Sequence, residues 1–569
     1  MSLTACLAAA CAPPPPPRPN VLLVTLDTTR ADRLGCYGNV RATSPNLDAL
    51  AREAVLYTEA RATSSWTLPA LAALALLLAI GHLVAAQASP RSAGRALLDL
   101  EALALAPALG CGLASSITFL SLFFGLGPPR WWFFGALALA LLAWHLAPGR
   151  SAGRSPVPRS PERAMSRPLA ALAITTLAVA AVLFLMWNDA RPDGRWDAYA
   201  IWNARARLLH RAPGDIATVL HRTQLGHPDY PLFLPAAIAA QFGILGNDSA
   251  SSSALTSFSF LVGAGLLSFV LLRRVGPPAL AAGGTALIWS TPFLVDLGQA
   301  QMADLPSGYL FLAALGGLAL RLDRTNLPGP ITTFAAASLA LLAWTKNEGL
   351  VLAALLVILF VLCRRGREPH REGRQPPRQR ALLAVGTLAT VLPLSSLILF
   401  KLSWAPANDL LSQLQGEQLL HDLTDPERWL ASIAGFATEL INWPRWGLLW
   451  PLVAAIAACF LRRKTTWDAL PARFMTLALA GAVLAWCSMY VATPRVQEWH
   501  MAMSLDRLLS QLAPAIVVWA LSTPVRKYAS VWSRDLRARQ GGRPQATSEQ
   551  LPPRHLPPCN QRRPTAPPK

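Results

Sequence analysis

The sequence predicts an all-α membrane protein that crosses the bilayer many times. Of its 569 residues, 53% are hydrophobic and only 14% are charged, whereas soluble domains carry about 25% charged residues. The apolar residues form uncharged runs of roughly 17–25 residues, the length that a helix needs to cross the hydrocarbon. These runs are continuous and rich in Leu and Ala, unlike the alternating strands of a barrel. We therefore expect a bundle of about 12–13 membrane-spanning helices.

The positive charge is distributed as expected for loops that fix membrane orientation. The net charge is +20, but the arginines cluster between the apolar runs, at 150–167, at 364–380 and after 526. This is the pattern of the positive-inside rule. It argues against nucleic acid as a partner. The eight cysteines show neither the spacing of a metal site nor a disulfide framework.

Four regions follow from these changes in composition. Residues 1–70 are not membrane-like, and 71–167 hold apolar segments and a basic linker. Residues 168–523 form the main apolar bundle. Residues 524–569 are basic and Pro-rich, which is typical of a disordered tail.

Orientation can be propagated from the two basic loops. If 148–167 and 364–380 are cytoplasmic, the loop 188–230 is external. The two assignments agree if the short apolar segment 231–246 does not cross fully. The polar residues that then share the external side are Asp197, Asp229, Asp304, Glu348 and His500. This convergence predicts one functional site.

The first external loop combines an acid with an aromatic pattern. Trp196, Tyr199 and Trp202 recur at every third residue, a spacing that predicts an aromatic stripe on a helix at headgroup depth. Asp197 stands at the start of this stripe. The alternative is an interfacial anchor beside a solvated acid, which does not account for the position of Asp197.

A second acid precedes the next apolar segment. His227 and Asp229 belong to His227-Pro228-Asp229-Tyr230-Pro231. The two prolines favour extended backbone. Asp229 is therefore either a functional acid at the membrane surface or a capping residue at a helix entry.

Further charges stand at membrane depth. Asp304 opens one apolar run, Lys346 and Glu348 interrupt another, and Arg507 follows His500 near the last run. Such charges cost roughly 3 kcal/mol or more unless paired, and they usually face a polar cavity. The alternatives are a structural Lys346–Glu348 pair and an Arg507 side chain that extends to the interface.

Residues from about 168 to 523 resemble the large membrane glycosyltransferases of the GT-C fold, in the branch of aminoarabinose transferases and protein mannosyltransferases. The matching pieces are Trp196-Asp197-Ala198-Tyr199-Ala200-Ile201-Trp202-Asn203, His227-Pro228-Asp229-Tyr230-Pro231, Ala303-Asp304-Leu305-Pro306, Thr345-Lys346-Asn347-Glu348-Gly349 and Ser504-Leu505-Asp506-Arg507-Leu508-Leu509. The resemblance rests on their order and their common side of the membrane.

The resemblance implies a reaction and roles for these residues. Such enzymes move a sugar from a polyprenyl-phosphate donor to a glycan, lipid or protein acceptor, on the external or periplasmic face of the plasma or inner membrane. Asp197 matches the general base and Asp229 a second acid that places the acceptor or a divalent metal ion. Lys346 and Arg507 match phosphate partners. The resemblance assigns four further residues to substrate binding: Asp304, Glu348, His500 and His227.

Two other functions remain open at this point. A transporter or flippase of lipid-linked sugars needs the same groove and cations but no base. Plain transporters carry their charges nearer the midplane between two related halves, and no such halves are detectable in the sequence. The third candidate is a membrane-anchored, sulfatase-like hydrolase.

The hydrolase alternative comes from the N-terminal region. Residues 20–30 read as a buried strand that ends in Asp27, and 44–51 as a capped helix. This region resembles the start of sulfatases, in which Asp27 matches the first metal ligand and Thr67 the nucleophile position. Membrane sequence begins directly afterwards, and about 50 residues cannot build the α/β hydrolase sheet. We expect an incomplete fragment without hydrolase activity.

Overall fold

In the computed structural model, the chain divides into two compact units, Met1–Ser64 and Ser65–Lys569. The structure describes residues 34–40, 44–54, 67–89, 99–129, 131–146, 166–212, 214, 217–218, 220, 226–323, 329–365, 377–408, 411–413, 416–461 and 470–541.

The described part of the first unit contains a 3₁₀ turn, η2 (Gly35–Tyr37), and a helix, α2 (Pro45–Glu53). The helix predicted at 44–51 is therefore present. Pro45 lies at its start, where a missing N–H costs nothing. Asp48 ties the turn to the helix, because its Oδ1 accepts hydrogen bonds from the Cys36 amide at 2.7 Å and the Ser44 hydroxyl at 2.9 Å. The strand predicted at 20–30, with Asp27, lies outside the described residues.

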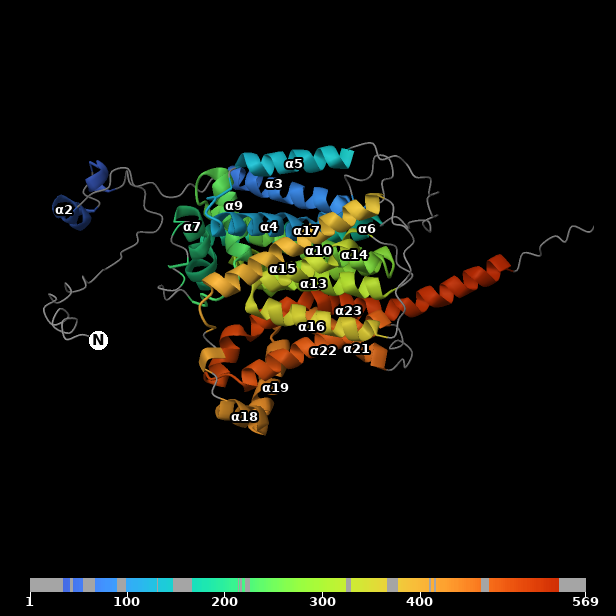
Figure 1. The fold of residues 1–569 in the computed structure, drawn as a ribbon. Helices are drawn as coiled ribbons and strands as arrows, with labels where there is room; N and C mark the ends of the chain where they lie inside the picture. Colours follow the sequence, from blue (N-terminus) through green and yellow to red (C-terminus); the bar gives the residue numbers. More distant parts are fainter. Residues whose placement is uncertain are drawn as a thin grey trace, which may run out of the picture. The chain divides into compact units, whose positions relative to one another are not determined.

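The second unit is a bundle of roughly parallel and antiparallel helices (Figure 1). Among the described residues, nine helices are long and apolar enough to cross a membrane. They are α3 (Thr67–Ala86), α4 (Leu100–Phe123), α6 (Arg167–Ala190), α10 (Ala250–Arg273), α13 (Asp304–Leu322), α16 (Asn347–Arg364), α17 (Pro377–Leu399), α22 (Leu470–Val491) and α23 (Gln497–Gly541). The prediction of an all-α polytopic membrane protein is confirmed.

The number of long spans differs from the expected 12–13. A tenth span results if α11 (Pro278–Ser290) and α12 (Pro292–Ala300) count as one helix bent by 61°. Pro292 lies at the bend and cannot continue the hydrogen-bond ladder of α11. The other apolar helices of the described chain are shorter. They are α5 (Trp131–Leu146), α9 (Phe233–Leu245), α15 (Ala335–Thr345) and α21 (Leu449–Leu461).

The short helix α9 does not cross the bundle. At its start, the carbonyl of Tyr230 lies 3.4 Å from Arg205, and after its end Asp248 pairs with Arg207 and Arg211. All three arginines belong to α7 (Ala204–Arg211), which is only eight residues long. Because a helix of this length spans about 12 Å, both ends of α9 lie on the same side. This agrees with the expectation for 231–246.

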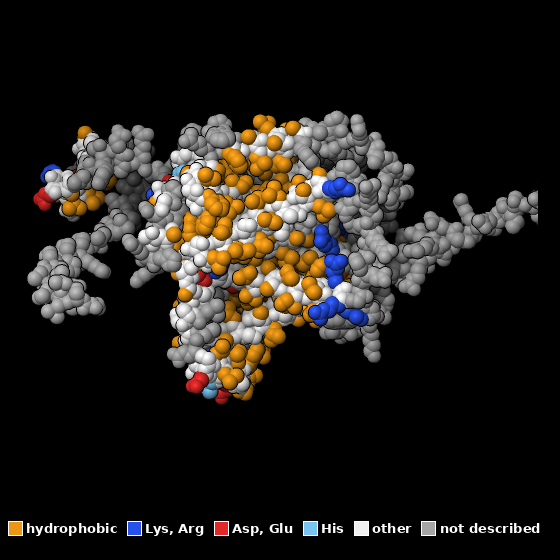
Figure 2. Space-filling model, viewed as in Figure 1, with side chains coloured by type: hydrophobic (Ala, Val, Ile, Leu, Met, Phe, Trp, Pro, Cys, Tyr) orange, Lys and Arg blue, Asp and Glu red, His pale blue; other side chains and the backbone are white. Residues whose placement is uncertain are grey.

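The two ends of the bundle differ in charge. Lys and Arg side chains gather at one end, and hydrophobic side chains cover the face between the ends (Figure 2). Arg274 at the end of α10 pairs with Glu101 at the start of α4, with an Nε–Oε1 distance of 2.7 Å. A concentration of basic side chains at one end of a bundle is the pattern that the positive-inside rule describes.

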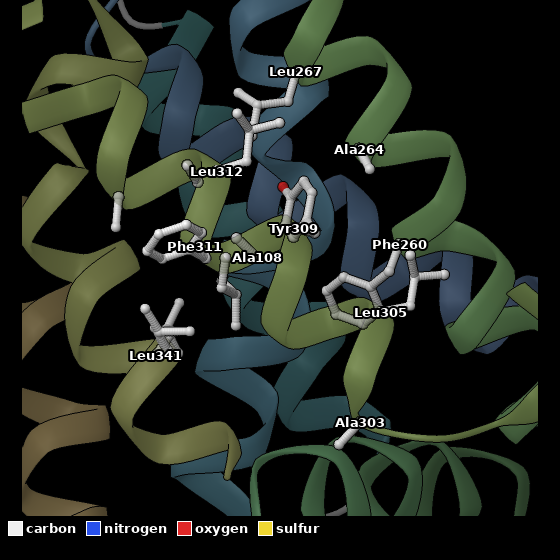
Figure 3. Packing of buried hydrophobic residues seen from close by; sticks show 14 of the residues in the cluster. Ala108, Phe260, Ala264, Leu267, Ala303, Leu305, Tyr309, Phe311, Leu312 and Leu341 are labelled. Carbon is white, nitrogen blue, oxygen red and sulfur yellow. The ribbon is translucent and has the colours of Figure 1, made fainter. Parts of the chain in front are cut away.

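The core is built around α13, of which 94% lies inside the bundle. Tyr309 on this helix is fully buried, and its hydroxyl donates to the carbonyl of Ala104 at 2.6 Å. Its ring meets Phe260 edge-on at 5.4 Å, with Leu305 and Leu312 nearby (Figure 3). A helix that is apolar all round must be buried in this way. Its first residue, Asp304, therefore belongs to the most deeply buried of the nine long helices of the described chain.

Candidate functional site

A buried ion-pair network begins at Asp304. Lys346, between α15 and α16, places its Nζ 2.9 Å from Asp304 Oδ1 and 3.2 Å from Glu348 Oε1. Gln511 of α23 donates to the same Asp304 oxygen at 3.0 Å. Lys346 is 4% exposed and Asp304 1%. Since an unpaired buried charge costs several kcal/mol, these contacts fix the ends of three helices to one another.

Lys346 is held in its charged form. Burial lowers the pKa of this lysine, but Asp304 and Glu348 outweigh burial and bring the pKa above its ordinary value. The ammonium is therefore protonated at neutral pH, and both neighbouring carboxylates share it. The expected Lys346–Glu348 pair exists, but Asp304 is the closer partner.

A second ion pair, between Asp197 and Arg507, is more accessible. The guanidinium of Arg507 donates to Asp197 Oδ2 and also to the carbonyl of Met503 at 2.9 Å. The side chains of Asp197 and Arg507 are 31% and 24% exposed. Asp197 is thus the most open of the predicted acids, since Asp229 and Asp304 are each 1% exposed and the Glu348 side chain is 16% exposed.

Backbone contacts hold the loop of Asp197 against the bundle. Gly194 has φ 77°, a left-handed conformation that suits glycine. The next amide, of Arg195, donates to the carbonyl of Ala300 at 3.3 Å. At the other end of the loop, Asn203 donates to Gln301 at 2.7 Å. The link between α12 and α13 therefore positions Asp197.

The prediction that Trp196, Tyr199 and Trp202 form one exposed aromatic stripe is wrong for Trp202. Residues 198–203 form a π-helix, η4 (Ala198–Asn203), directly after Asp197. Trp196 and Tyr199 are exposed, but Trp202 is 2% exposed and packs 5.9 Å from the ring of Tyr230. A π-helix has more residues per turn than an α-helix. Side chains three residues apart therefore do not share a face, and Trp202 turns inward.

Asp229 is enclosed by amides and a lysine. Asn347 and Asn408 donate to its Oδ2 at 2.6 and 2.7 Å. The Nζ of Lys401, near the end of the span that contains α17, lies 2.6 Å from the Asp229 carbonyl and 2.7 Å from Asn347 Oδ1. Asp229 does not cap α9, which begins at Phe233 without a side-chain cap. Its carboxylate instead connects this loop to Asn347 at the start of α16 and to Asn408 beyond α17.

Tyr230 connects the Lys346–Glu348 pair with the loop that carries Asp229. Its hydroxyl donates to Glu348 Oε1 at 3.1 Å, and its ring lies 5.5 Å from Lys346 Nζ. Burial raises the pKa of Tyr230 well above its ordinary value, so the phenol remains a hydrogen-bond donor. His227 stacks on the ring at 4.7 Å. Asp229 and Lys346 are thus parts of one polar cluster.

Arg205 supports the turn at residues 226–230, which carries Asp229. The sequence did not predict this role. Arg205 is 1% exposed and donates to the carbonyls of Gly226 and His227. Burial lowers its pKa to about 10, while Asp229 opposes the shift. His227 has φ 51°, an uncommon conformation for a residue with a Cβ. The arginine therefore stabilises a strained turn that presents Asp229.

His500 lies farther out on α23. Its Nδ1 is 2.8 Å from the Thr493 hydroxyl, and its ring meets Tyr490 at 5.2 Å. The Tyr490 hydroxyl contacts Ser504 at 2.9 Å. Seven residues separate His500 from Arg507, which is two helical turns or roughly 10 Å on one face.

The structure thus brings all eight predicted residues of the membrane domain to the end of the bundle opposite the Arg274–Glu101 pair. It adds residues that the sequence reading did not select: Tyr230, Asn347, Lys401, Asn408, Gln511 and Arg205. Gln511 offered a signal, because it is an amide inside an apolar run, four residues after Arg507.

Within the described part of the chain, no group of three or more His, Cys, Asp or Glu side chains is arranged to hold a metal ion. The predicted ligand Asp27 lies outside that part. Thr67, at the predicted nucleophile position, is the first residue of α3.

Comparison with known proteins bears on the N-terminal region alone. A family model described as Sulfatase matches residues 19–76. The match runs through the first unit and ends inside α3, which supports the predicted sulfatase resemblance of this region. No curated protein and no solved structure matches the chain.

Proposed function

We propose that this chain is a membrane glycosyltransferase of the GT-C type, which transfers a sugar from a polyprenyl-phosphate donor to an acceptor hydroxyl at the external membrane face. The observation that carries the proposal is the Asp197–Arg507 pair. It unites the most accessible acid of the cluster with a fixed guanidinium at the end of the bundle opposite the basic loops.

The proposed step assigns one task to each partner. Asp197 accepts the proton of the acceptor hydroxyl as the acceptor oxygen bonds to the anomeric carbon. The bond from that carbon to the donor phosphate breaks, and the phosphate leaves with the electron pair. Arg507 stabilises the departing phosphate, since a guanidinium binds phosphate oxygens in a fixed geometry. The step thus moves the proton to Asp197, the electron pair to the phosphate and the sugar to the acceptor.

The remaining cluster residues position this pair. The charge of Lys346 is already shared by Asp304 and Glu348, so we assign it to positioning rather than to direct phosphate contact. Lys401, whose side chain is 29% exposed, is the second cation open to the donor phosphate. Asp229, which is 1% exposed, holds Asn347 and Asn408 beside Lys401 and so contributes to positioning. No step is assigned to a divalent metal ion.

The proposal predicts a change in the products of the cell. Mass spectrometry of glycolipids and glycans from cells with and without the gene should show one glycosylated product lost and its unmodified acceptor accumulated. Identical profiles under conditions in which the gene is expressed would refute the proposal.

A further inference from the structure

A polar pocket of about 280 Å³ lies beside α18 (Gly416–Thr424), the helix that projects from the bundle in Figure 1. Its charged and amide side chains are Gln413, Gln418, Asp422, Arg428 and Arg495. The volume is near the lower end of the roughly 300–1,000 Å³ of small-molecule sites. It therefore suits a ligand of about one sugar ring.

The charges of the pocket favour a neutral ligand. Arg428 already donates to the carbonyls of Val491 and Thr493, at 2.7 and 2.8 Å. Asp422 is 4% exposed, and its Oδ1 accepts from Gln418 at 2.8 Å. Arg428 Nη1 also lies 3.7 Å from Asp422 Oδ1, so these two charges offset each other, and the exposed amides of Gln413 and Gln418 supply donors and acceptors for hydroxyl groups.

The apolar walls fit the same class of ligand. Leu419, Ala492 and Pro494 complete the lining. Binding sites for small molecules combine such apolar walls with a few convergent polar groups, and a sugar ring presents both C–H faces and hydroxyl edges.

The pocket connects directly to the cluster. Thr493, which lines it, lies 2.8 Å from His500 Nδ1. His500 is in turn two turns of α23, or roughly 10 Å, from Arg507. A ring in the pocket would therefore lie beyond His500, at least roughly 10 Å from Arg507.

We propose that this pocket binds a neutral saccharide unit of the acceptor that lies away from the unit that receives the transferred sugar. The inference rests on the proposed transferase function for its biological meaning. Binding itself can be measured without any transfer, so the two proposals fail separately.

The test uses the purified full chain in detergent and saturation-transfer NMR with the neutral methyl glycosides of glucose, mannose, galactose and arabinose. At least one glycoside should bind. Gln418→Ala should weaken that binding at least tenfold, because the variant loses the amide that donates a hydrogen bond to Asp422. The matched control is Glu417→Ala, an exposed neighbour on the same helix that does not line the pocket, and it should leave binding unchanged.

Three outcomes would overturn the inference: no glycoside binds, Gln418→Ala binds like the unaltered chain, or inorganic phosphate displaces the glycoside. Gln413→Ala provides a second, exposed lining position in case Gln418→Ala does not fold. Asp197→Asn should bind the glycoside normally, because Asp197 is not among the residues that line the pocket.

Discussion

Lys346 lies between Asp304 and Glu348, with its Nζ within 3.2 Å of a carboxylate oxygen of each. Asp304 opens the central helix α13, and Glu348 lies in the first turn of α16. One buried ammonium thus fixes two helix ends beneath the accessible Asp197–Arg507 pair.

Lys346→Met should strongly destabilise the bundle. The variant leaves two buried carboxylates without their cation, and breaking one side of a buried ion pair costs about 3–5 kcal/mol. Unfolding in detergent, followed by circular dichroism, measures the loss. A change below about 1 kcal/mol would show that the network does not fix the helix ends.

The same variant should acquire a pH dependence that the unaltered chain lacks. The pKa of Lys346 is raised, so its stabilisation is complete below the ordinary lysine pKa of about 10.4 and is lost only as pH rises through the higher folded pKa. In Lys346→Met the stranded carboxylates favour protonation, so stability should fall as pH rises from 5 to 8. Melting temperatures across this range test both statements. Parallel curves for the two proteins would contradict them.

Asn347 and Asn408 should prove energetically coupled. Both donate to Asp229 Oδ2, so each single Leu substitution leaves one donor in place. The double substitution removes both and should deviate from additivity by about 0.5–3 kcal/mol. A double-mutant cycle on unfolding free energies measures the coupling. Additive effects would mean that Asp229 is not held by the amide pair.

Arg205→Met should loosen the turn that carries Asp229. The substitution keeps an apolar stem but removes the donors to the Gly226 and His227 carbonyls. Hydrogen exchange in residues 226–230 should become faster, while α13 should remain protected. Unchanged exchange in the turn would show that the arginine does not stabilise it.

Much of the bundle was predictable, because long uncharged hydrophobic runs determine where membrane-spanning helices form. The number of membrane-spanning helices was harder to predict. Short apolar helices such as α9 resemble spans in composition, and only the contacts of α7 with both flanks show that α9 does not cross.

Most charged members of the site were predictable for a similar reason: a charge in an apolar run is costly and therefore conspicuous. Arg205 and Lys401 were missed. Asn347, Asn408 and Tyr230 were not predictable, since Asn and Tyr are ordinary at loop ends, whereas Gln511 stands out inside its apolar run. The burial of Trp202 was missed because the sequence carries no signal for the π-helix that turns it inward.

The central claim is that Asp197 is the base for sugar transfer. Membranes of cells that lack the gene supply donor and acceptor, and the purified chain is added to them. Asp193→Asn is the matched control, because Asp193 belongs to the same loop but pairs with Arg207 instead of Arg507. Both variants should melt at similar temperatures. We predict that Asp197→Asn lowers the rate of product formation by roughly 10²-fold or more, whereas Asp193→Asn remains within a few-fold of the unaltered chain. Transfer by Asp197→Asn at the native rate would contradict the account and would favour a transporter of lipid-linked sugars.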